Sequence, residues 1–349
     1  MRKKMLFVSC SAPNKLNPLL KPFEEIYNVS VIYKMDEYIP YYNENHKIKR
    51  RFLNLLEKIG IPYDYGLNKR IENHVRKNKT DIIFIVKGNE IMPSLLRRVR
   101  NDYADIKLVN WSLDNMYKRH NRSSFYTRSI SLYDLVVTTK IQNLHEGELQ
   151  DLGARDVQFV YQAYDKDIHK PCQHCSNVDT KHNILFVGCA EIERFNAMNY
   201  LAKKGFIVDV YGSGWDRGEF QDKHENLVYH YCNLLNEDYA NAISCSKISL
   251  CFLRKINNDT HTSRSVEIPA CGGFMLAERT DEHKKLFIEG VESEYFDSNE
   301  ELLSKVEFYL KNDRDRKKIA LSGFKRCAKE EYSYHDMAKK IFERIENIF

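Results

Sequence analysis

The sequence predicts an α/β fold with two domains. Short apolar runs alternate with amphipathic stretches from one end of the chain to the other, which is typical of strands that alternate with helices. Such alternation implies parallel sheets whose strands are joined by right-handed crossovers. The chain has 349 residues. Because a domain usually holds roughly 100–200 residues, we expect two domains.

A polar stretch without periodicity, residues 164–181, separates two series of predicted elements. We therefore predict a first Rossmann-like domain over residues 1–168, a linker over 169–181 and a second Rossmann-like domain over 182–332. Strands of the first domain are predicted at Met5–Ser9, Val29–Tyr33, Asp81–Val86, Lys107–Asn110, Leu135–Thr138 and Val157–Val160. Its helices are predicted at Ile48–Ile59, Leu67–Asn78, Met92–Asn101 and Ile141–Leu152, the last of which stops at Gly153.

The second half repeats the scheme. Strands are predicted at Asn183–Val187, Phe206–Tyr211, Lys247–Leu253 and Phe274–Ala277. Helices are predicted at Arg194–Lys204, Asp238–Ser244, Ser263–Cys271, Asn299–Leu310, Arg314–Lys329 and His335–Ile348. Sheets of this kind bind ligands beyond the carboxyl ends of their strands, so the loops that follow strands are the places to look for chemistry.

Composition and motifs exclude several classes of protein. The longest apolar runs, such as Ile82–Val86, stop far short of the roughly 20 residues that a membrane span needs. Residues 1–4 lead into an apolar stretch that is too short for a signal peptide, so we expect a cytoplasmic protein. Neither a Gly-x-Gly-x-x-Gly fingerprint nor a Walker loop occurs, which argues against NAD-dependent hydride transfer and simple ATPase chemistry.

Positive charge is concentrated in the first half. Residues 1–168 carry a net charge of +8 and residues 169–349 a net charge of −3, while the stretch 47–128 alone reaches +11. This stretch either meets an anionic partner or is a solvated helical surface. Its predicted helix over residues 47–58 has a basic face beside apolar side chains, which suggests peripheral contact with an anionic membrane. No recognition motif accompanies the charge, so we expect no nucleic-acid binding.

One cysteine pair has the spacing of a metal site. Among nine cysteines, Cys172 and Cys175 are spaced as in a zinc knuckle, with His169, His174 and His182 nearby. A structural zinc site usually has a second ligand pair at a defined distance, and the sequence contains no second Cys-x-x-Cys. Zinc binding and a reduced linker without metal are the two alternatives, and the sequence favours the linker.

Two loops of the first domain are candidates for ligand binding. Lys87 opens the loop Lys87-Gly88-Asn89-Glu90 after one predicted strand, and Asp114 follows another strand beside Trp111. A carboxylate at a strand end can act as a base or hold hydroxyl groups. The alternative is that Asp114 caps a helix, a position that aspartate favours.

In the second domain, candidates follow the first two strands. Gly188 ends one strand and Arg194 lies at the start of the next helix, where backbone N–H groups favour a phosphate. Gly212, Ser213 and Gly214 follow the other strand, and glycines allow the backbone to approach a ligand closely. A plain turn is the alternative for this second loop.

The segment 257–279 is densest in chemical groups. Thr262, Ser263 and Arg264 lie at a predicted helix start, facing any phosphate, and Glu267 lies three residues beyond Arg264. Hydroxyl and basic groups for a diphosphate, with a carboxylate for sugar hydroxyls, are what a nucleotide-sugar pocket requires. The alternative is that Arg264 and Glu267 pair on a helix surface, and spacing alone favours that alternative.

The segment SRSVEIPACGGFMLAERT, residues 263–280, resembles a motif of the CgeB-like glycosyltransferases, relatives of glycosyltransferase family 4 with the GT-B fold. The segments IIFIVKGNEIMP, LVNWSLDN, ILFVGCAEIERF and VYGSGW are similar too, so the resemblance covers most of the chain. It implies two Rossmann-like domains that face each other across a cleft. It also implies that a C-terminal helix, residues 333–349, crosses back to pack on the first domain.

The resemblance implies roles for particular residues. In family 4 a pair of glutamates separated by seven residues serves the donor. Glu267 matches the second of them, which grips the ribose hydroxyls, and Asp259 stands in place of the first, one methylene shorter. Arg264 would lie near the diphosphate, and Gly188 and Arg194 lie where the second domain opens toward the donor phosphates.

We therefore expect a glycosyltransferase for polysaccharide biosynthesis that uses a nucleoside-diphosphate sugar, with UDP or GDP as the nucleotide. The first domain would bind a glycan, lipid-linked or protein acceptor, with Asp114 touching acceptor or donor sugar. Kinship with family 4 suggests retention of configuration, without a metal or a separate cofactor. The alternatives are a nucleotide-sugar epimerase or hydrolase, with His261, Asp114 and Asp259 as acid and base groups, and a non-catalytic two-lobed binding protein.

Overall fold

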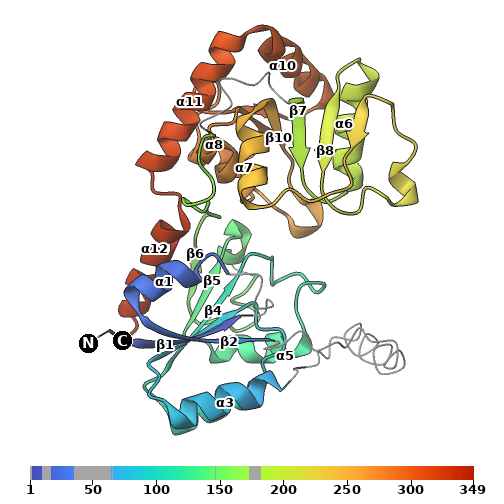
Figure 1. Ribbon diagram of the computed structural model, residues 1–349. Helices are drawn as coiled ribbons and strands as arrows, with labels where there is room; N and C mark the ends of the chain where they lie inside the picture. The colour runs from blue at the N-terminus through green and yellow to red at the C-terminus, as the bar shows by residue number, and fades with distance from the viewer. Residues whose placement is uncertain (1, 10–16, 35–63, 65, 146, 173–181) are drawn as a thin grey trace. The chain divides into compact units, whose positions relative to one another are not determined.

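The computed structural model describes residues 2–9, 17–34, 64, 66–145, 147–172 and 182–349. The chain divides into two compact units, each built around a six-stranded sheet (Figure 1). Unit 1 comprises Met1–Tyr161 and Tyr334–Phe349, and unit 2 comprises Gln162–Ser333. All strand pairs of both sheets are parallel, so the predicted α/β fold class is confirmed.

The sheet of unit 1 has the strand order β2-β1-β3-β4-β5-β6. Its strands are β1 (Lys4–Ser9), β2 (Asn28–Tyr33), β3 (Ile82–Val86), β4 (Lys107–Ser112), β5 (Leu135–Thr138) and β6 (Val157–Phe159). The order reverses between β1 and β3, and in doubly wound sheets such a reversal opens a crevice beyond the carboxyl ends of the strands.

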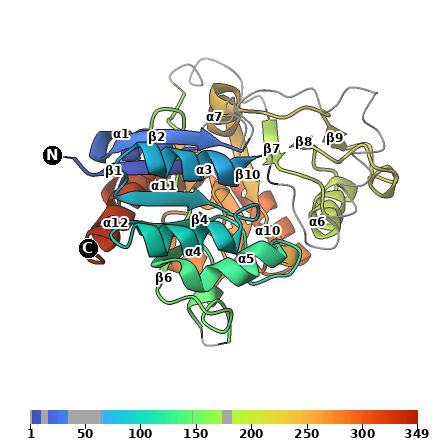
Figure 2. The same ribbon diagram turned by 90° about the horizontal axis from the view of Figure 1, so that it is seen from below.

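Helices cover both faces of this sheet. In Figure 2, α3, α4 and α5 lie next to one another over one face. Their apolar side chains, such as Ile71 and Leu95, join strand residues such as Ile83 in one buried core. The helices of unit 1 are α1 (Leu20–Ile26), α3 (Leu67–Lys77), α4 (Pro93–Asp102), α5 (Ser124–Ser129) and α12 (Tyr334–Glu346), with short 3-10 helices at Ile130–Leu132 and Ile141–Leu144.

The C-terminal helix α12 belongs to the first unit and packs beside α1. Phe342 of α12 contacts Tyr27, with ring centroids 5.7 Å apart. Two ion pairs tie the helix to distant parts of the unit: Glu346 lies 2.6 Å from Lys3, and Arg344 lies 2.7 Å from Asp156. The chain therefore returns to its first unit after completing the second.

The sheet of unit 2 has the strand order β12-β11-β10-β7-β8-β9. Its strands are β7 (His182–Val187), β8 (Val208–Tyr211), β9 (Leu227–Tyr229), β10 (Ser246–Cys251), β11 (Met275–Glu278) and β12 (Glu294–Phe296). The order reverses between β7 and β10, which is the strand arrangement of dinucleotide-binding sheets. We therefore expect the ligand of this unit beyond the carboxyl ends of these two strands.

The core of unit 2 lies between the sheet and the helices α6 and α10. Phe186 of β7 and Met198 of α6 are buried in it, together with Val306 of α10. On the other side, α7 and α8 contact β10. The helices of unit 2 are α6 (Ile192–Lys203), α7 (Asn236–Ser244), α8 (Arg264–Ala270), α9 (Asp281–Leu286), α10 (Asn299–Lys311) and α11 (Asp313–Lys329), with 3-10 helices at Gly218–Phe220 and Lys255–Asn257.

One predicted helix is wrong. The segment Ile141–Leu152 forms a 3-10 helix only over Ile141–Leu144 and continues in turns. Gly147 lies inside it with φ of +87°, a conformation that ends a regular helix, so the apolar periodicity does not decide the local structure. The predicted helix Ile48–Ile59 lies outside the described residues.

No helix in the described part of the chain is long and apolar enough to cross a membrane. The basic segment 47–58 also lies outside the described residues, so its contact with a membrane stays a prediction.

Candidate functional site

A pocket of about 260 Å³ opens in unit 2 beyond the carboxyl ends of β7 and β8. It adjoins the end of β7, one of the two strands between which the strand order reverses, and α8, which follows the other strand β10 in the chain, also lines it. The turns after both strands, the segment that leads into α7, and α8 all contribute side chains. The lining residues are His169, Val187, Gly188, Cys189, Gly212, Ser213, Asn233, Leu234, Leu235, Asn236, Tyr239, Arg264 and Glu267.

The backbone turns after β7 and β8 meet at the base of this pocket. The N–H of Gly188 donates to the carbonyl of Tyr211 at 2.8 Å, and the N–H of Gly212 donates to the carbonyl of Cys232 at the same distance. The indole N–H of Trp215 donates to the carbonyl of Gly188 at 2.9 Å. Because of these bonds, backbone atoms rather than side chains lie next to the space that a ligand would occupy.

A second pocket of about 270 Å³ adjoins the first and shares Gly212, Ser213 and Asn233 with it. Its other lining residues are Gly214, Trp215, Asp216, Tyr231 and Cys232. The sequence predicted Gly212, Ser213 and Gly214 as ligand-facing, and all three line one or both pockets.

Arg264 and Glu267, the two residues that the nucleotide-sugar interpretation singled out, both line the first pocket. The alternative was an ion pair between them on the helix surface. Within the described ranges, the guanidinium of Arg264 makes no hydrogen bond and no ion pair within 4.0 Å, and its Nε is buried. Burial alone would lower the pKa of Arg264. Nearby acidic groups, Glu267 among them, raise this pKa by more than burial lowers it, so the guanidinium stays charged.

Glu267 is held by Tyr239, a residue that sequence reasoning missed. The Tyr239 hydroxyl donates to Oε2 of Glu267 at 3.1 Å, and burial beside this carboxylate raises the pKa of Tyr239 well above its usual value. The hydroxyl therefore keeps its proton and fixes one carboxylate oxygen.

His169 also lines the pocket, although the sequence placed it in a linker. Its Nδ1 accepts from the N–H of Asp165 at 3.0 Å, so the ring carries its hydrogen on Nε2. The ring lies edge-on to Tyr239, with centroids 5.6 Å apart. No spacing in the sequence connects His169 with a residue 70 positions further on, so only the fold brings them together.

Arg194 does not line either pocket. Its side chain is buried in unit 2, where Nη1 donates to the carbonyl of Cys189 at 3.0 Å and Nη2 lies 3.6 Å from a carboxylate oxygen of Glu191. Arg194 therefore stabilises the turn after β7 without lining the pocket. The sequence interpretation had placed it at the donor phosphates.

Thr262 and Ser263 precede α8 without lining the described pockets. The backbone N–H of Thr262 donates to the hydroxyl of Ser265 at 3.0 Å, and that hydroxyl lies 2.7 Å from Nε2 of His283. This buried chain of hydrogen bonds sets the entry into α8 and so supports the position of Arg264.

Asp259 and His261 also stay outside the lining of both pockets. His261 is buried, and its Nε2 accepts from the N–H of Gln162 at 3.0 Å. Its role in this arrangement is to anchor the chain at the beginning of unit 2. Asp259 is partly exposed, and its backbone N–H donates to the carbonyl of Arg254 at 3.1 Å.

Asp114 belongs to unit 1, where the structure brings it together with Lys87 at 2.8 Å. Both follow strands whose carboxyl ends adjoin, β4 and β3. Lys87 has a positive φ of 60°, and Asn110 holds this turn by donating to the carbonyls of Ile85 and Lys87, each at 3.1 Å. No helix begins at Asp114, so the capping alternative does not apply.

The zinc alternative for Cys172 and Cys175 is only partly visible, because Cys175 and His174 lie outside the described residues. Cys172 is a free thiol whose backbone N–H donates to the hydroxyl of Ser244 at 3.1 Å.

The chain is similar to several known proteins. The family model described as "Glycosyl transferase-like" matches residues 194–343, a little under half of the chain. No curated protein matches the chain in sequence. Sucrose-phosphate synthase from Thermosynechococcus elongatus is similar in structure, with a TM-score of 0.67 at 10% identity over 100% of this chain and 99% of that one. The fold is GT-B.

Two further solved structures share this fold. Anabaena HepE in complex with UDP-glucose has a TM-score of 0.65 at 14% identity, over 99% of each chain. A putative UDP-N-acetylglucosamine 2-epimerase from Listeria monocytogenes has a TM-score of 0.55 at 14% identity, over 99% of this chain and 96% of that one. At such identities the likeness establishes the fold alone.

Proposed function

We propose that this chain is a glycosyltransferase that takes a sugar from a nucleoside-diphosphate sugar. The observation that carries the proposal is Arg264, a charged guanidinium that lines the pocket and has no hydrogen-bond or ion-pair partner within the described ranges. An unpaired charge in a partly buried site is unfavourable until a ligand supplies the opposite charge. A guanidinium binds phosphate oxygens in pairs, so a diphosphate is the ligand that suits it.

Glu267 makes a simple anion a poor occupant of the same pocket. Its Oε2 accepts from Tyr239, while no described residue donates to its Oε1. A carboxylate repels phosphate oxygens but accepts readily from hydroxyl groups, which the ribose of a nucleotide provides. One basic and one acidic side chain in one pocket therefore suit a ligand with a diphosphate next to a sugar.

The comparisons support this class of ligand. The matched family is described as glycosyl transferase-like, and a protein of the same fold, HepE, is named with UDP-glucose bound. We therefore expect the nucleotide to be UDP in preference to GDP. The adjoining second pocket offers further room beside the backbone of Gly212 and Gly214 for the rest of the donor.

In the proposed reaction, Arg264 stabilises the negative charge that develops on the leaving diphosphate. Asp114, oriented by Lys87, serves the acceptor or the donor sugar from unit 1. We further propose retention of configuration without a metal, a glycan, lipid-linked or protein acceptor, and membership of the CgeB-like group. Asp259 remains a candidate for the donor sugar.

A thermal-shift series with UDP, GDP, ADP, CMP and dTDP tests the proposal directly. Binding to the native state raises the melting temperature in proportion to the logarithm of ligand concentration. We expect UDP or GDP to raise it clearly and CMP, with one phosphate, to raise it least. If no nucleoside diphosphate raises the melting temperature, a non-catalytic binding protein becomes the better interpretation.

A nucleotide-sugar epimerase is the second candidate, because a putative epimerase has the same fold. Epimerisation needs acid and base groups at the sugar, and one of the three candidates, His261, is buried with its Nε2 already accepting from Gln162. Incubation with UDP-sugars in the absence of acceptor separates the two reactions. Rapid conversion without acceptor would favour the epimerase or a hydrolase over the transferase.

A further inference from the structure

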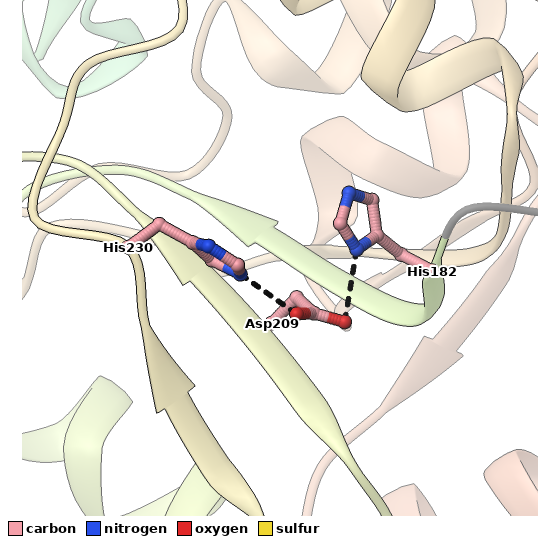
Figure 3. Close-up of side chains that lie close together, drawn as sticks. All are labelled: His182, Asp209 and His230. Carbon is pink, nitrogen blue, oxygen red and sulfur yellow. Dashed lines mark hydrogen bonds and ion pairs between the residues drawn. The ribbon is translucent and has the colours of Figure 1, made fainter.

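Three side chains that commonly bind metals meet on the sheet of unit 2, at a place that the donor site does not use. His182 opens β7, Asp209 lies in β8, and His230 follows β9 directly. Figure 3 shows both imidazole rings turned toward the carboxylate between them. Nδ1 of His182 lies 2.9 Å from one Asp209 oxygen, and Nε2 of His230 lies 2.7 Å from the other.

The three ligand atoms all lie within 4.8 Å of one another. His182 is 5% exposed, Asp209 13% and His230 30%, so the cluster is half enclosed with one side open to solvent.

One nitrogen in the cluster has no well-directed hydrogen bond, although an Asp209 oxygen lies 2.9 Å away. Nδ1 of His182 is buried and close to Asp209, yet its geometry is not that of a hydrogen bond to any atom in the described part of the chain. Buried polar atoms normally have a hydrogen-bond partner, and those without one require an explanation such as an ion. A lone pair on this nitrogen would be satisfied by a metal.

We propose that His182, Asp209 and His230 form a binding site for a divalent transition metal, with Zn²⁺ as the expected ion. Two imidazole nitrogens and one carboxylate oxygen are a ligand set that zinc accepts, whereas calcium and magnesium prefer oxygen alone. Zinc ligands lie about 2.0–2.1 Å from the metal, which places neighbours of a tetrahedron ~3.3 Å apart. The observed 2.7 and 2.9 Å separations need to open by about 0.4–0.6 Å, and ligand atoms that lie up to 4.8 Å apart need to close by up to about 1.5 Å.

Tyr211 supports the orientation of both histidines. Its ring stacks on His230 with centroids 4.1 Å apart and an angle of 5° between the planes. Its hydroxyl lies 3.4 Å from Nε2 of His182, on the side of the ring away from Asp209. Partners of this kind fix the ring positions of metal-binding histidines and leave the other nitrogen for the metal.

The site connects three adjacent strands, and its His230 adjoins a residue of the second pocket. Tyr211 precedes Gly212, and Tyr231 follows His230 and lines the second pocket. A bound ion would therefore stabilise the edge formed by β7, β8 and β9, with water completing its coordination on the open side.

Titration of metal-stripped protein with Zn²⁺ and Co²⁺, followed by calorimetry and visible absorption, tests the site. We expect the wild type to bind Zn²⁺, to melt at a higher temperature with it, and to give cobalt absorption bands typical of nitrogen and oxygen ligands. His230→Gln and Asp209→Asn should weaken binding by more than about tenfold. The control His120→Gln changes an exposed histidine of unit 1 and should bind as the wild type does.

Equal Zn²⁺ affinity of wild type, His230→Gln and Asp209→Asn would overturn the proposal. So would thiolate-to-cobalt charge-transfer absorption in the wild type, since it would place the metal on cysteines such as Cys172. Absence of any Zn²⁺ binding by the wild type would overturn it as well. These last two results need no variant, so the test holds even if a variant fails to fold, which circular dichroism would reveal.

Discussion

A Cβ atom on Gly212 would lie 2.1 Å from the carbonyl oxygen of Gly188. Real Cβ atoms do not approach another heavy atom so closely. The ends of the adjacent parallel strands β7 and β8 can therefore come this close only if residue 212 has no side chain. Gly212 also has φ of +134°, a conformation open to glycine. The backbone of the pocket base therefore depends on the residue type at this strand end.

Gly212→Ala is expected to destabilise unit 2, because it combines backbone strain of about 1–3 kcal/mol with the clash against Gly188. Urea unfolding followed by circular dichroism measures the loss as a lower midpoint. The matched control is Gly205→Ala, which has φ of +95° but no heavy atom within 4 Å of the added Cβ. A smaller loss is expected there. Equal losses in both variants would contradict a role for the close approach.

Arg264→Gln is expected to weaken UDP binding by roughly 10- to 100-fold, since a hydrogen bond to a charged group contributes about 1.5–3 kcal/mol. The thermal shift produced by UDP should shrink accordingly, while the melting temperature of the free protein changes little. Arg314→Gln removes the same charge from an exposed position of α11 and should leave the UDP shift unchanged. Similar losses in both variants would point to a general effect of charge.

Much of the fold could be predicted because the strands are buried and bounded by breakers. β5 has the predicted bounds, Leu135–Thr138, with all four residues buried. The strands β9 and β12, of three residues each, were missed, whereas β6, of the same length, was predicted, so strand length alone does not explain the misses. The wrong helix over Ile141–Leu152 followed a real apolar periodicity that Gly147 interrupts.

The candidate site could be predicted only where function depends on residue type at a strand end or a helix start. Gly188, Gly212 and Glu267 were predicted from such positions and line one pocket. The direction of the Arg194 side chain is set by tertiary contacts with Cys189 and Glu191, so no local pattern could reveal it. The cluster around Asp209 is likewise assembled from three strands.

Arg194→Met is expected to lower stability more than UDP affinity. It leaves the carbonyl of Cys189 without its donor and Glu191 with one cationic partner fewer, and an unsatisfied buried acceptor costs about 1–3 kcal/mol. Urea midpoints and UDP thermal shifts measured on the same variant separate the two effects. A large loss of UDP binding with unchanged stability would instead place Arg194 at the donor phosphates.

Asp114→Asn is expected to lower the rate of sugar transfer by about 10²-fold or more if the carboxylate takes part in proton transfer. The UDP-induced thermal shift should stay the same, because the nucleotide pocket lies in unit 2 and Asp114 in unit 1. Asp105→Asn, at an exposed position of unit 1, is the control and should retain full activity. Wild-type activity of Asp114→Asn would show that the carboxylate of this residue takes no part in the reaction.

His283 should make the stability of unit 2 depend on pH. Burial lowers the pKa of His283 to about 4, while its Nδ1 lies 2.6 Å from the carbonyl of Glu278 and its Nε2 lies 2.7 Å from the Ser265 hydroxyl. The unfolded chain takes up the proton near the ordinary value of about 6.5. Between these values only the unfolded state is protonated, so stability falls as pH decreases from 6.5 to 4, by up to about 3 kcal/mol.

Urea midpoints measured from pH 7.5 to 4 on wild type and His283→Gln check this dependence. The variant loses two buried contacts and should be less stable at pH 7, yet its stability should decline less steeply below pH 6.5 because the titrating group is gone. His120→Gln, which removes an exposed histidine, should keep the wild-type slope. Parallel curves for wild type and His283→Gln would mean that other groups produce the acid sensitivity.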